Sequence, residues 1–256
     1  MSDSAHPDAT LAPALAAHLR SLTPARVGLA RTGVSLETHD LLDFQRCHAQ
    51  ARDAVHSRLQ AAALAVTLSQ ITSAEVLRLH SAAPDRATYL QRPDLGRILD
   101  QPSRNLLASR SSIANSLALI VADGLSALAV ERHAATLLKE LLPLLTGWPL
   151  APLCVVEQAR VAIGDEIGLA LGAQISVVLI GERPGLSSPD SLGVYITWNP
   201  RPGRTDAERN CISNVRAEGL SYAQAAAQLG YYLTEARRRQ LTGVTLKQQE
   251  HRLKEG

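Results

Sequence analysis

The sequence predicts an α/β fold in which helices flank a mostly parallel sheet, preceded by a helical N-terminal region. Five of the six residues at positions 175–180, ISVVLI, are apolar. A strand with almost no polar side chain is typical of a parallel sheet that is covered on both faces. Similar apolar runs alternate with helical segments from Leu117 onward, and this alternation implies right-handed crossovers between parallel strands. We place a boundary near residue 105, between a helical region at 1–104 and a sheet domain with a C-terminal helix at 105–256.

The region before residue 105 is read as helices. Leucines that recur between positions 11 and 22 predict a short amphipathic helix, which we expect to lie on the rest of its own chain. Ser35 is a possible N-cap for a second helix. Its apolar face comprises Leu41, Phe44, His48, Ala51, Val55 and Leu59, with the histidine expected as a packing residue. Residues 61–79 are expected to continue as helix, and Pro84 breaks the pattern.

The second half of the chain is read as four strands and three helices. The strands are expected at 117–121, 153–158, 175–180 and 192–198. The helices are expected from Ser126 to about residue 142, within 164–172, and from Ser221 to about residue 240. The segment 204–215, which contains Cys211, is read as polar and without a strand.

The residues that follow the most apolar strand are the first candidate for a binding site. Ligands of open α/β sheets sit in the crevice outside the carboxyl ends of the strands. The segment 181–185, GERPG, occupies that edge and brings Glu182 and Arg183 there. The alternative is an ordinary loop, because Gly and Pro commonly end strands and an adjacent Glu and Arg can form a loop ion pair.

Composition excludes several classes of function. The formal net charge of +2 and an aromatic content of 3% disfavour nucleic-acid binding, which requires a basic surface or stacking rings. Three widely spaced cysteines favour free thiols in the reducing cytoplasm over disulfides. No apolar run approaches the roughly 20 residues of a membrane span, and the N-terminus lacks the pattern of a signal peptide.

The familiar catalytic and phosphate-binding motifs are absent from the sequence. It has no GxGxxG after a strand, no GxxxxGK[ST], no HExxH and no zinc-like cluster of Cys and His. DGLS at 123–126 offers a helix start that could hold an anion. No histidine occurs between His133 and His251, so we expect no imidazole at the sheet edge and no hydrolase triad there. These observations indicate a ligand shelf without catalytic groups of its own.

Several longer segments resemble one enzyme family. IGERPGLSSPDSLGVYITWNP and AERNCISNV are similar to the light (small) subunit of ethanolamine ammonia-lyase, as are YLQRPDLGR, VADGLS and ARVAIGDEIGLALGAQ earlier in the chain. The resemblance runs in the same order from about residue 25 to 240, and GERPGL with the downstream CISN is its most specific part.

The resemblance implies an adenosylcobalamin-dependent lyase that converts ethanolamine to acetaldehyde and ammonia. In that family the heavy subunit carries the substrate site, and the Rossmann-like domain of the light subunit helps to hold cobalamin at the interface of the hetero-oligomer. The family positions that contact cobalamin correspond to Val161, Glu182 and Cys211. Cys211 is equally well explained as a plain packing thiol, since free cysteine behaves as a small hydrophobe.

The resemblance also carries expectations about cobalt and location. The family keeps the cofactor's own dimethylbenzimidazole on cobalt (base-on), which agrees with the absence of a DxHxxG loop, so no cobalt ligand is expected from this chain. The family resemblance makes a bacterial microcompartment possible, but the short segment before the matched region favours plain cytoplasm. Two other functions were weighed: a non-catalytic α/β interaction subunit without a cofactor, and a nucleotide-dependent transferase, which would require a phosphate loop that the sequence lacks.

Overall fold

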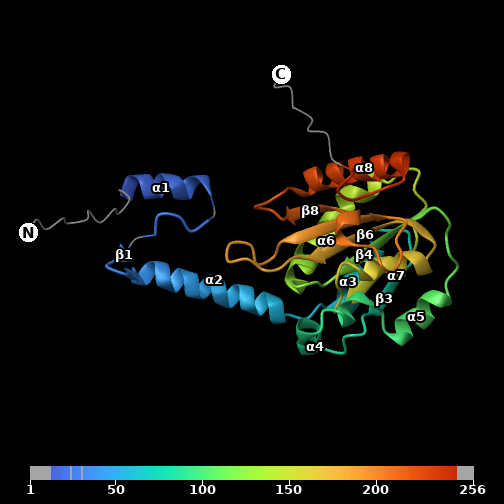
Figure 1. The fold of residues 1–256 in the computed structure, drawn as a ribbon, viewed down its shortest axis with the longest axis horizontal. Helices are drawn as coiled ribbons and strands as arrows, with labels where there is room; N and C mark the ends of the chain where they lie inside the picture. The colour runs from blue at the N-terminus through green and yellow to red at the C-terminus, as the bar shows by residue number, and fades with distance from the viewer. Residues whose placement is uncertain (1–12, 24, 30, 247–256) are drawn as a thin grey trace, which may run out of the picture.

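A six-stranded sheet is the centre of the molecule (Figure 1). The computed structural model describes residues 13–23, 25–29 and 31–246. The strand order is β3-β5-β4-β6-β7-β8. The strands are β3 (Val76–His80), β4 (Ser116–Ala122), β5 (Leu153–Glu157), β6 (Ala173–Gly181), β7 (Leu192–Trp198) and β8 (Arg209–Val215). The predicted fold class, a mostly parallel sheet flanked by helices with a helix before it, is confirmed.

The direction of β7 differs from the predicted parallel arrangement. β3, β5, β4 and β6 are parallel, but β7 is antiparallel to β6 and β8 is antiparallel to β7. A parallel crossover requires a dozen residues or more, and the connection between Gly181 and Leu192 is too short for one. The polar segment that contains Cys211 was expected to lack a strand, and this expectation was wrong, because it forms the edge strand β8.

Residues 76–79 were expected to be helical, and this expectation was also wrong. With His80 they form β3, in which Leu77 and Leu79 are buried while Arg78 between them is exposed. This alternation of period two is the strand signal, but it is only five residues long and directly follows an apolar helix. The sheet therefore includes residues from before the expected boundary near 105, and the division of the chain into two regions stays a prediction.

Eight α-helices are described. They are α1 (Pro13–Leu22), α2 (Thr38–His56), α3 (Ala61–Ser69), α4 (Arg86–Gln91), α5 (Gln101–Ala108), α6 (Ala127–Leu141), α7 (Ile163–Ala170) and α8 (Tyr222–Arg239). Short 3₁₀ turns occur at Leu95–Arg97, Leu142–Leu144 and Asp206–Glu208, and a two-stranded hairpin pairs β1 (Arg31–Thr32) with β2 (Ser35–Leu36). Ser126 and Ser221 cap α6 and α8 through their side-chain oxygens, at the helix starts that the sequence predicted.

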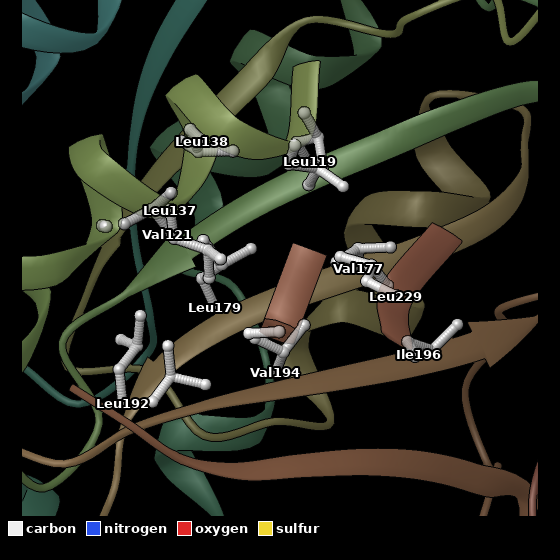
Figure 2. Packing of buried hydrophobic residues seen from close by; sticks show 14 of the residues in the cluster. Leu119, Val121, Leu137, Leu138, Val177, Leu179, Leu192, Val194, Ile196 and Leu229 are labelled. Atoms are coloured by element: carbon white, nitrogen blue, oxygen red, sulfur yellow. The ribbon is translucent and has the colours of Figure 1, made fainter. Parts of the chain in front are cut away.

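Both faces of the sheet are buried under helices. On one face, Val177 and Leu179 of β6 pack with Leu137 and Leu138 of α6 and with Leu229 of α8 (Figure 2). On the other face, a second cluster joins alternate residues of the same strands to α5 and α7. Two-sided burial explains why β4 and β6 are almost entirely apolar, and it holds their carboxyl ends in fixed positions.

An N-terminal arm, which comprises α1, β1, β2 and α2, projects from the sheet domain (Figure 1). Only Cys47 and Ala54 of α2 are buried. Its expected apolar face is largely uncovered in this chain: Leu41 and Phe44 are exposed, and so is His48, which stacks on the Phe44 ring at 6.2 Å. The last turn of α2 meets the sheet domain, so one end of the helix lies near the strand ends.

None of the helices in the described ranges is both long enough and apolar enough to span a membrane.

Candidate functional site

Two glycines allow the ends of β4 and β6 to touch. A Cβ atom on Gly124 would lie 2.2 Å from the carbonyl oxygen of Gly181, and a Cβ on Gly181 would lie 2.0 Å from the carbonyl oxygen of Ser126. The Leu125 N–H donates to the Gly181 carbonyl at 2.9 Å, and the Ser126 N–H donates to the Asp123 carbonyl. DGLS and GERPG therefore form one unit at the sheet edge. Because these N–H groups are engaged, they are not available to the anion that the sequence suggested at this helix start.

Two adjoining hollows open at this edge. The strand-end hollow, about 430 Å³, is lined by residues that include Val161, Ile180 and Glu182. The arm hollow, about 550 Å³, lies between α2 and the segment after β6. Leu125, Arg160 and Arg183 line both hollows, so the two form a continuous shelf across the carboxyl ends of the strands. This is where open α/β sheets bind their ligands.

Glu182 is held in place by donors from two other elements. The Ser191 hydroxyl and the Asn214 N–H donate to Oε2, the latter at 3.1 Å, and the Ser213 hydroxyl donates to Oε1. An ionised carboxylate offers about four lone-pair positions, so these bonds leave one acceptor position, on Oε1. Glu182 therefore combines a fixed orientation with capacity for one further donor at the wall of the strand-end hollow.

Val161 shares the strand-end hollow with Glu182, whereas Cys211 is not among the residues that line it. Val161 lines the strand-end hollow beside Glu182, just before α7 begins. Cys211 lies in β8 opposite Tyr195, which also lines the hollow, and its sulfur is 4.0 Å from the Ser213 hydroxyl. Desolvation by neighbouring groups raises the pKa of the Cys211 thiol, so it stays protonated near neutral pH and is a poor nucleophile.

Tyr89 connects the shelf to two arginines. The ring is fully buried, its hydroxyl donates to the Ala159 carbonyl at 3.0 Å, and its edge reaches the strand-end hollow. The guanidinium carbons of Arg160 and Arg86 lie 4.3 and 4.8 Å from the ring centroid. Arg86 is itself buried and donates to the carbonyls of Val55 and Gly124 at 2.7 and 2.8 Å, so it joins the end of α2 to the strand ends.

Asp123 is the buried carboxylate at the end of β4. It is 0% exposed, and it accepts from the N–H groups of Gln158 and Ala159 at 2.9 and 3.0 Å. Arg86 approaches it at 3.4 Å. Burial disfavours the charged form and raises the pKa of Asp123 to about 6 in spite of these partners. Asp123 therefore shapes the turn that follows β5 and does not face the shelf.

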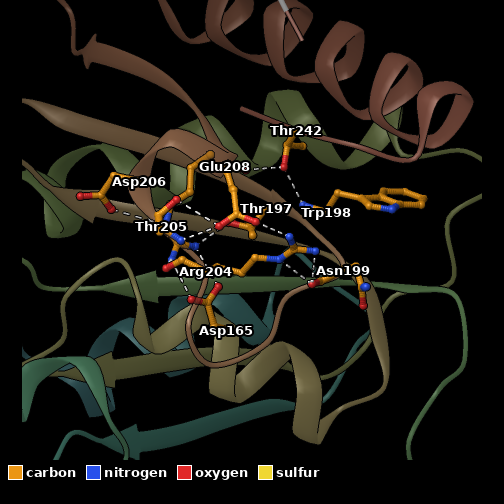
Figure 3. A network of polar contacts seen from close by, with 10 residues as sticks. Asp165, Thr197, Trp198, Asn199, Arg204, Thr205, Asp206, Glu208 and Thr242 are labelled. Atoms are coloured by element: carbon orange, nitrogen blue, oxygen red, sulfur yellow. Dashed lines mark hydrogen bonds and ion pairs between the residues drawn. The ribbon is translucent and has the colours of Figure 1, made fainter. Parts of the chain in front are cut away.

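A buried ion pair fixes α7, the helix that follows Val161. Arg209 of β8 donates to both carboxylate oxygens of Asp165 at 2.8 and 2.6 Å and to the Thr197 hydroxyl at 2.8 Å. Figure 3 shows Asp165 and Thr197 within the wider network, where Thr242 donates to the Glu208 carbonyl. Both members of the pair are buried, so the network clamps α7 to the antiparallel part of the sheet.

The expectation of a sheet edge without imidazole was wrong. His80 is the last residue of β3 and therefore lies at the carboxyl edge, and His48 of α2 lines the arm hollow. The error follows from the misread strand, because residues 61–79 were assigned to a helix, and His80 was therefore not placed at a strand end. His80 Nδ1 bonds to the Ser81 carbonyl at 2.7 Å. Within the described residues no group of three or more His, Cys, Asp and Glu side chains could hold a metal ion.

Several lining residues were not singled out from the sequence, among them Tyr89, Arg160 and Tyr195. Tyr89 and Arg160 lie in segments that the resemblance did quote, but neither follows an apolar strand directly. Tyr195 stands in a strand, where an aromatic residue is ordinary. The assembled shelf carries a fixed acceptor, arginine donors and apolar walls, but no paired nucleophile and base among the described residues that line it. It is therefore suited to binding.

Comparison with known proteins gives consistent matches along the chain. The family model described as ethanolamine ammonia-lyase light chain matches residues 14–247. The ethanolamine ammonia-lyase small subunit of Pseudomonas aeruginosa strain PAO1 is 59% identical over 234 residues, which cover 90% of this chain and 85% of that protein. The small subunits of Xanthomonas campestris strain B100 and Ralstonia nicotianae are 56% and 58% identical, covering 92% and 90% of this chain and 88% and 87% of their own lengths.

Proposed function

Because the chain belongs to the ethanolamine ammonia-lyase light-chain family, we propose that it holds adenosylcobalamin at an interface with a heavy subunit. The assembled enzyme converts ethanolamine to acetaldehyde and ammonia, and the substrate site lies on the heavy subunit. The small-subunit name of the relatives supports a larger partner. The described residues that line the shelf include no paired nucleophile and base, which supports a division of labour in which this chain binds and orients.

The residues of the shelf fit a corrin. Its periphery carries amide groups, whose N–H atoms require acceptors, and Glu182 retains one acceptor position at the hollow. Its flat face requires apolar contact, which Val161, Ile180 and Leu125 offer. The shelf is open and continuous over two hollows, as a broad ligand requires. The single observation that carries the proposal is the fixed carboxylate of Glu182 on this shelf.

Each of the three residues has a separate role in the proposal. Glu182 accepts from a peripheral amide, Val161 contacts the ring system, and Cys211 borders the ligand with a protonated thiol. When bound, the cofactor supplies radical chemistry that no side chain can provide. The ion pair between Asp165 and Arg209 keeps Val161 in place by fixing α7.

We assign no cobalt ligand to this chain. The chain lacks the DxHxxG spacing of proteins that ligate cobalt with their own imidazole, so the cofactor keeps its dimethylbenzimidazole. His48 of the arm hollow is not given this role. The three widely spaced cysteines favour the cytoplasm as the compartment, and the family resemblance makes a bacterial microcompartment the alternative.

Titration of the assembled complex with cobalamin tests the proposal. The chain is co-purified with its heavy subunit, and binding is followed by visible absorption. Loss of the acceptor in Glu182→Ala removes a hydrogen bond to a charged group, worth about 1.5 to 3 kcal/mol, so we expect affinity to fall by roughly 10-fold or more. Glu157→Ala is the matched control, because Glu157 ends β5, another strand of the same sheet, and does not line the hollows.

Two outcomes would contradict the proposal. If Glu182→Ala binds cobalamin as tightly as the unmodified complex, Glu182 has no role in the site. The complex could instead deaminate ethanolamine while its cobalamin makes no contact with this chain. That result would favour the alternative, in which this chain is a non-catalytic interaction subunit that does not contact the cofactor. If the heavy subunit alone deaminates ethanolamine at the full rate, this chain is not required for the reaction.

A further inference from the structure

The two hollows carry an excess of positive charge. Among the described residues that line them, three are arginines, Arg52, Arg160 and Arg183, and one is an acid, Glu182. Glu182 is already engaged with Ser191 and Ser213. Arg52 pairs with the Asp53 carboxylate at 3.4 Å. Arg160 and Arg183 remain as the cations of the shelf beside one acid, an excess of positive charge that is unexpected for a site that binds only neutral amides.

Arg160 is the best placed of these cations. It lines both hollows, at the point where they join. Its Nε is buried without a hydrogen-bond partner, and its Nη2 makes only a long bond of 3.4 Å to the Tyr89 carbonyl. An unpaired buried donor destabilises the protein unless a ligand satisfies it. Arg160 thus has a donor that its own chain leaves unused.

The position of Arg160 is fixed before any ligand binds. Its guanidinium stacks on the buried Tyr89 ring at 4.3 Å, and its main-chain N–H donates to the Gly96 carbonyl at 2.7 Å. Gly96 allows this packing, because a Cβ there would lie 2.9 Å from the Tyr89 ring and 3.0 Å from Arg160 Cγ. Arg183 is exposed and has no such support, so ordering it costs more side-chain entropy.

We propose that Arg160 binds the phosphodiester of the cobalamin nucleotide loop. This inference rests on the proposed function and adds to it a residue and a part of the ligand. The phosphodiester is the anionic group of cobalamin, whereas its peripheral amides are neutral. A guanidinium presents a planar set of donors that matches phosphate oxygens. Stacking on Tyr89 holds the Arg160 guanidinium in one place, so Arg160 is suited to positioning this part of the ligand.

Cobinamide, a corrinoid that lacks the nucleotide loop and its phosphate, separates this inference from general corrin binding. In the assembled complex we expect Arg160→Gln to weaken binding of cobalamin by about 10-fold and to leave binding of cobinamide unchanged. Arg97→Gln is the matched control, because it makes the same change of charge at an exposed residue outside both hollows, next to Gly96.

Two further measurements cover variants that fold poorly or bind cobinamide too weakly to measure. The phosphorus NMR resonance of cobalamin bound to the complex should differ between the unmodified protein and Arg160→Lys, which keeps the charge but loses the planar donor set. In the unmodified complex, inorganic phosphate should compete with cobalamin and not with cobinamide.

Equal weakening of cobalamin and cobinamide by Arg160→Gln would overturn the inference, and so would a phosphorus resonance that is the same in the unmodified and Arg160→Lys complexes. Competition by inorganic phosphate against both corrinoids would assign Arg160 to a site for free phosphate instead. If the unmodified complex does not bind cobalamin in contact with this chain, the proposed function itself is wrong. This outcome can be distinguished from the results that overturn only the role of Arg160.

Discussion

Asp123 is a single carboxylate on which the turn after β5 depends. It has no exposed surface, and two main-chain N–H groups and Arg86 surround it. Its pKa of about 6 in the folded chain exceeds the ordinary value of about 3.9 in an unfolded one. The folded state therefore binds more protons than the unfolded state between these two pH values.

The stability of the chain should consequently depend on pH through Asp123. The favourable contribution is fully present below about pH 4 and is lost as pH rises through about 6. A difference of about two pKa units corresponds to roughly 3 kcal/mol. Urea unfolding at several pH values should show the stability of the unmodified chain falling by that amount relative to Asp123→Asn. A difference between the two proteins that stays constant from pH 4 to 7 would contradict the assignment.

Among single residues, the sequence located Glu182 but not the groups that hold it. Glu182 follows the apolar run that predicts β6, so the point where this run ends predicts that Glu182 lies at the edge of the sheet. Ser191, Ser213 and Asn214 reach it only because β7 and β8 are antiparallel neighbours of β6, and no local pattern encodes that pairing. Arg160 is recognised only once Tyr89, 71 residues earlier in sequence, is placed against it.

At the scale of elements, α7 depends on one buried ion pair. Asp165 and Arg209 have side chains that are 3% and 2% exposed, and removing one member leaves the other charge unpaired inside the protein. We expect Asp165→Ala to lower the free energy of unfolding by about 3 to 5 kcal/mol, measured by urea denaturation.

Asp206 provides the control for this prediction. It approaches the same arginine at 3.6 Å, but its side chain is 97% exposed, so solvent screens the pair. Asp206→Ala should leave stability almost unchanged. Similar losses for both variants would mean that the ion pair with Asp165 does not anchor α7.

Elements with strong local signals were predictable. β6 has its apolar run, and α6 and α8 have serine caps at the expected starts. β3 is too short for its alternation to be distinguished from the end of a helix. β8 is a polar edge strand, with exposed residues at Cys211, Ser213 and Asn214, and only its pairing with β7 defines it.

Across the whole molecule, stability is unevenly distributed. β4 is buried along its full length, whereas α2 has two buried residues among nineteen. Local opening is easiest where few apolar groups are buried. Hydrogen exchange of the isolated chain should therefore show amides of α2 exchanging far faster than those of β4, which should exchange only when the whole domain unfolds. Equal protection of α2 and β4 would contradict this view of the arm.

The attachment of α2 has a mechanical consequence. Arg86 holds the helix by the carbonyl of Val55, close to its final turn, while the opposite end, near Thr38, stands away from the sheet. At 1.5 Å of rise per residue, a rotation about Val55 moves Thr38 roughly two and a half times as far as it moves His48. The part of α2 near His48 lines the arm hollow. A rotation that slightly widens the arm hollow at His48 therefore produces a larger displacement of the N-terminal end of α2 near Thr38.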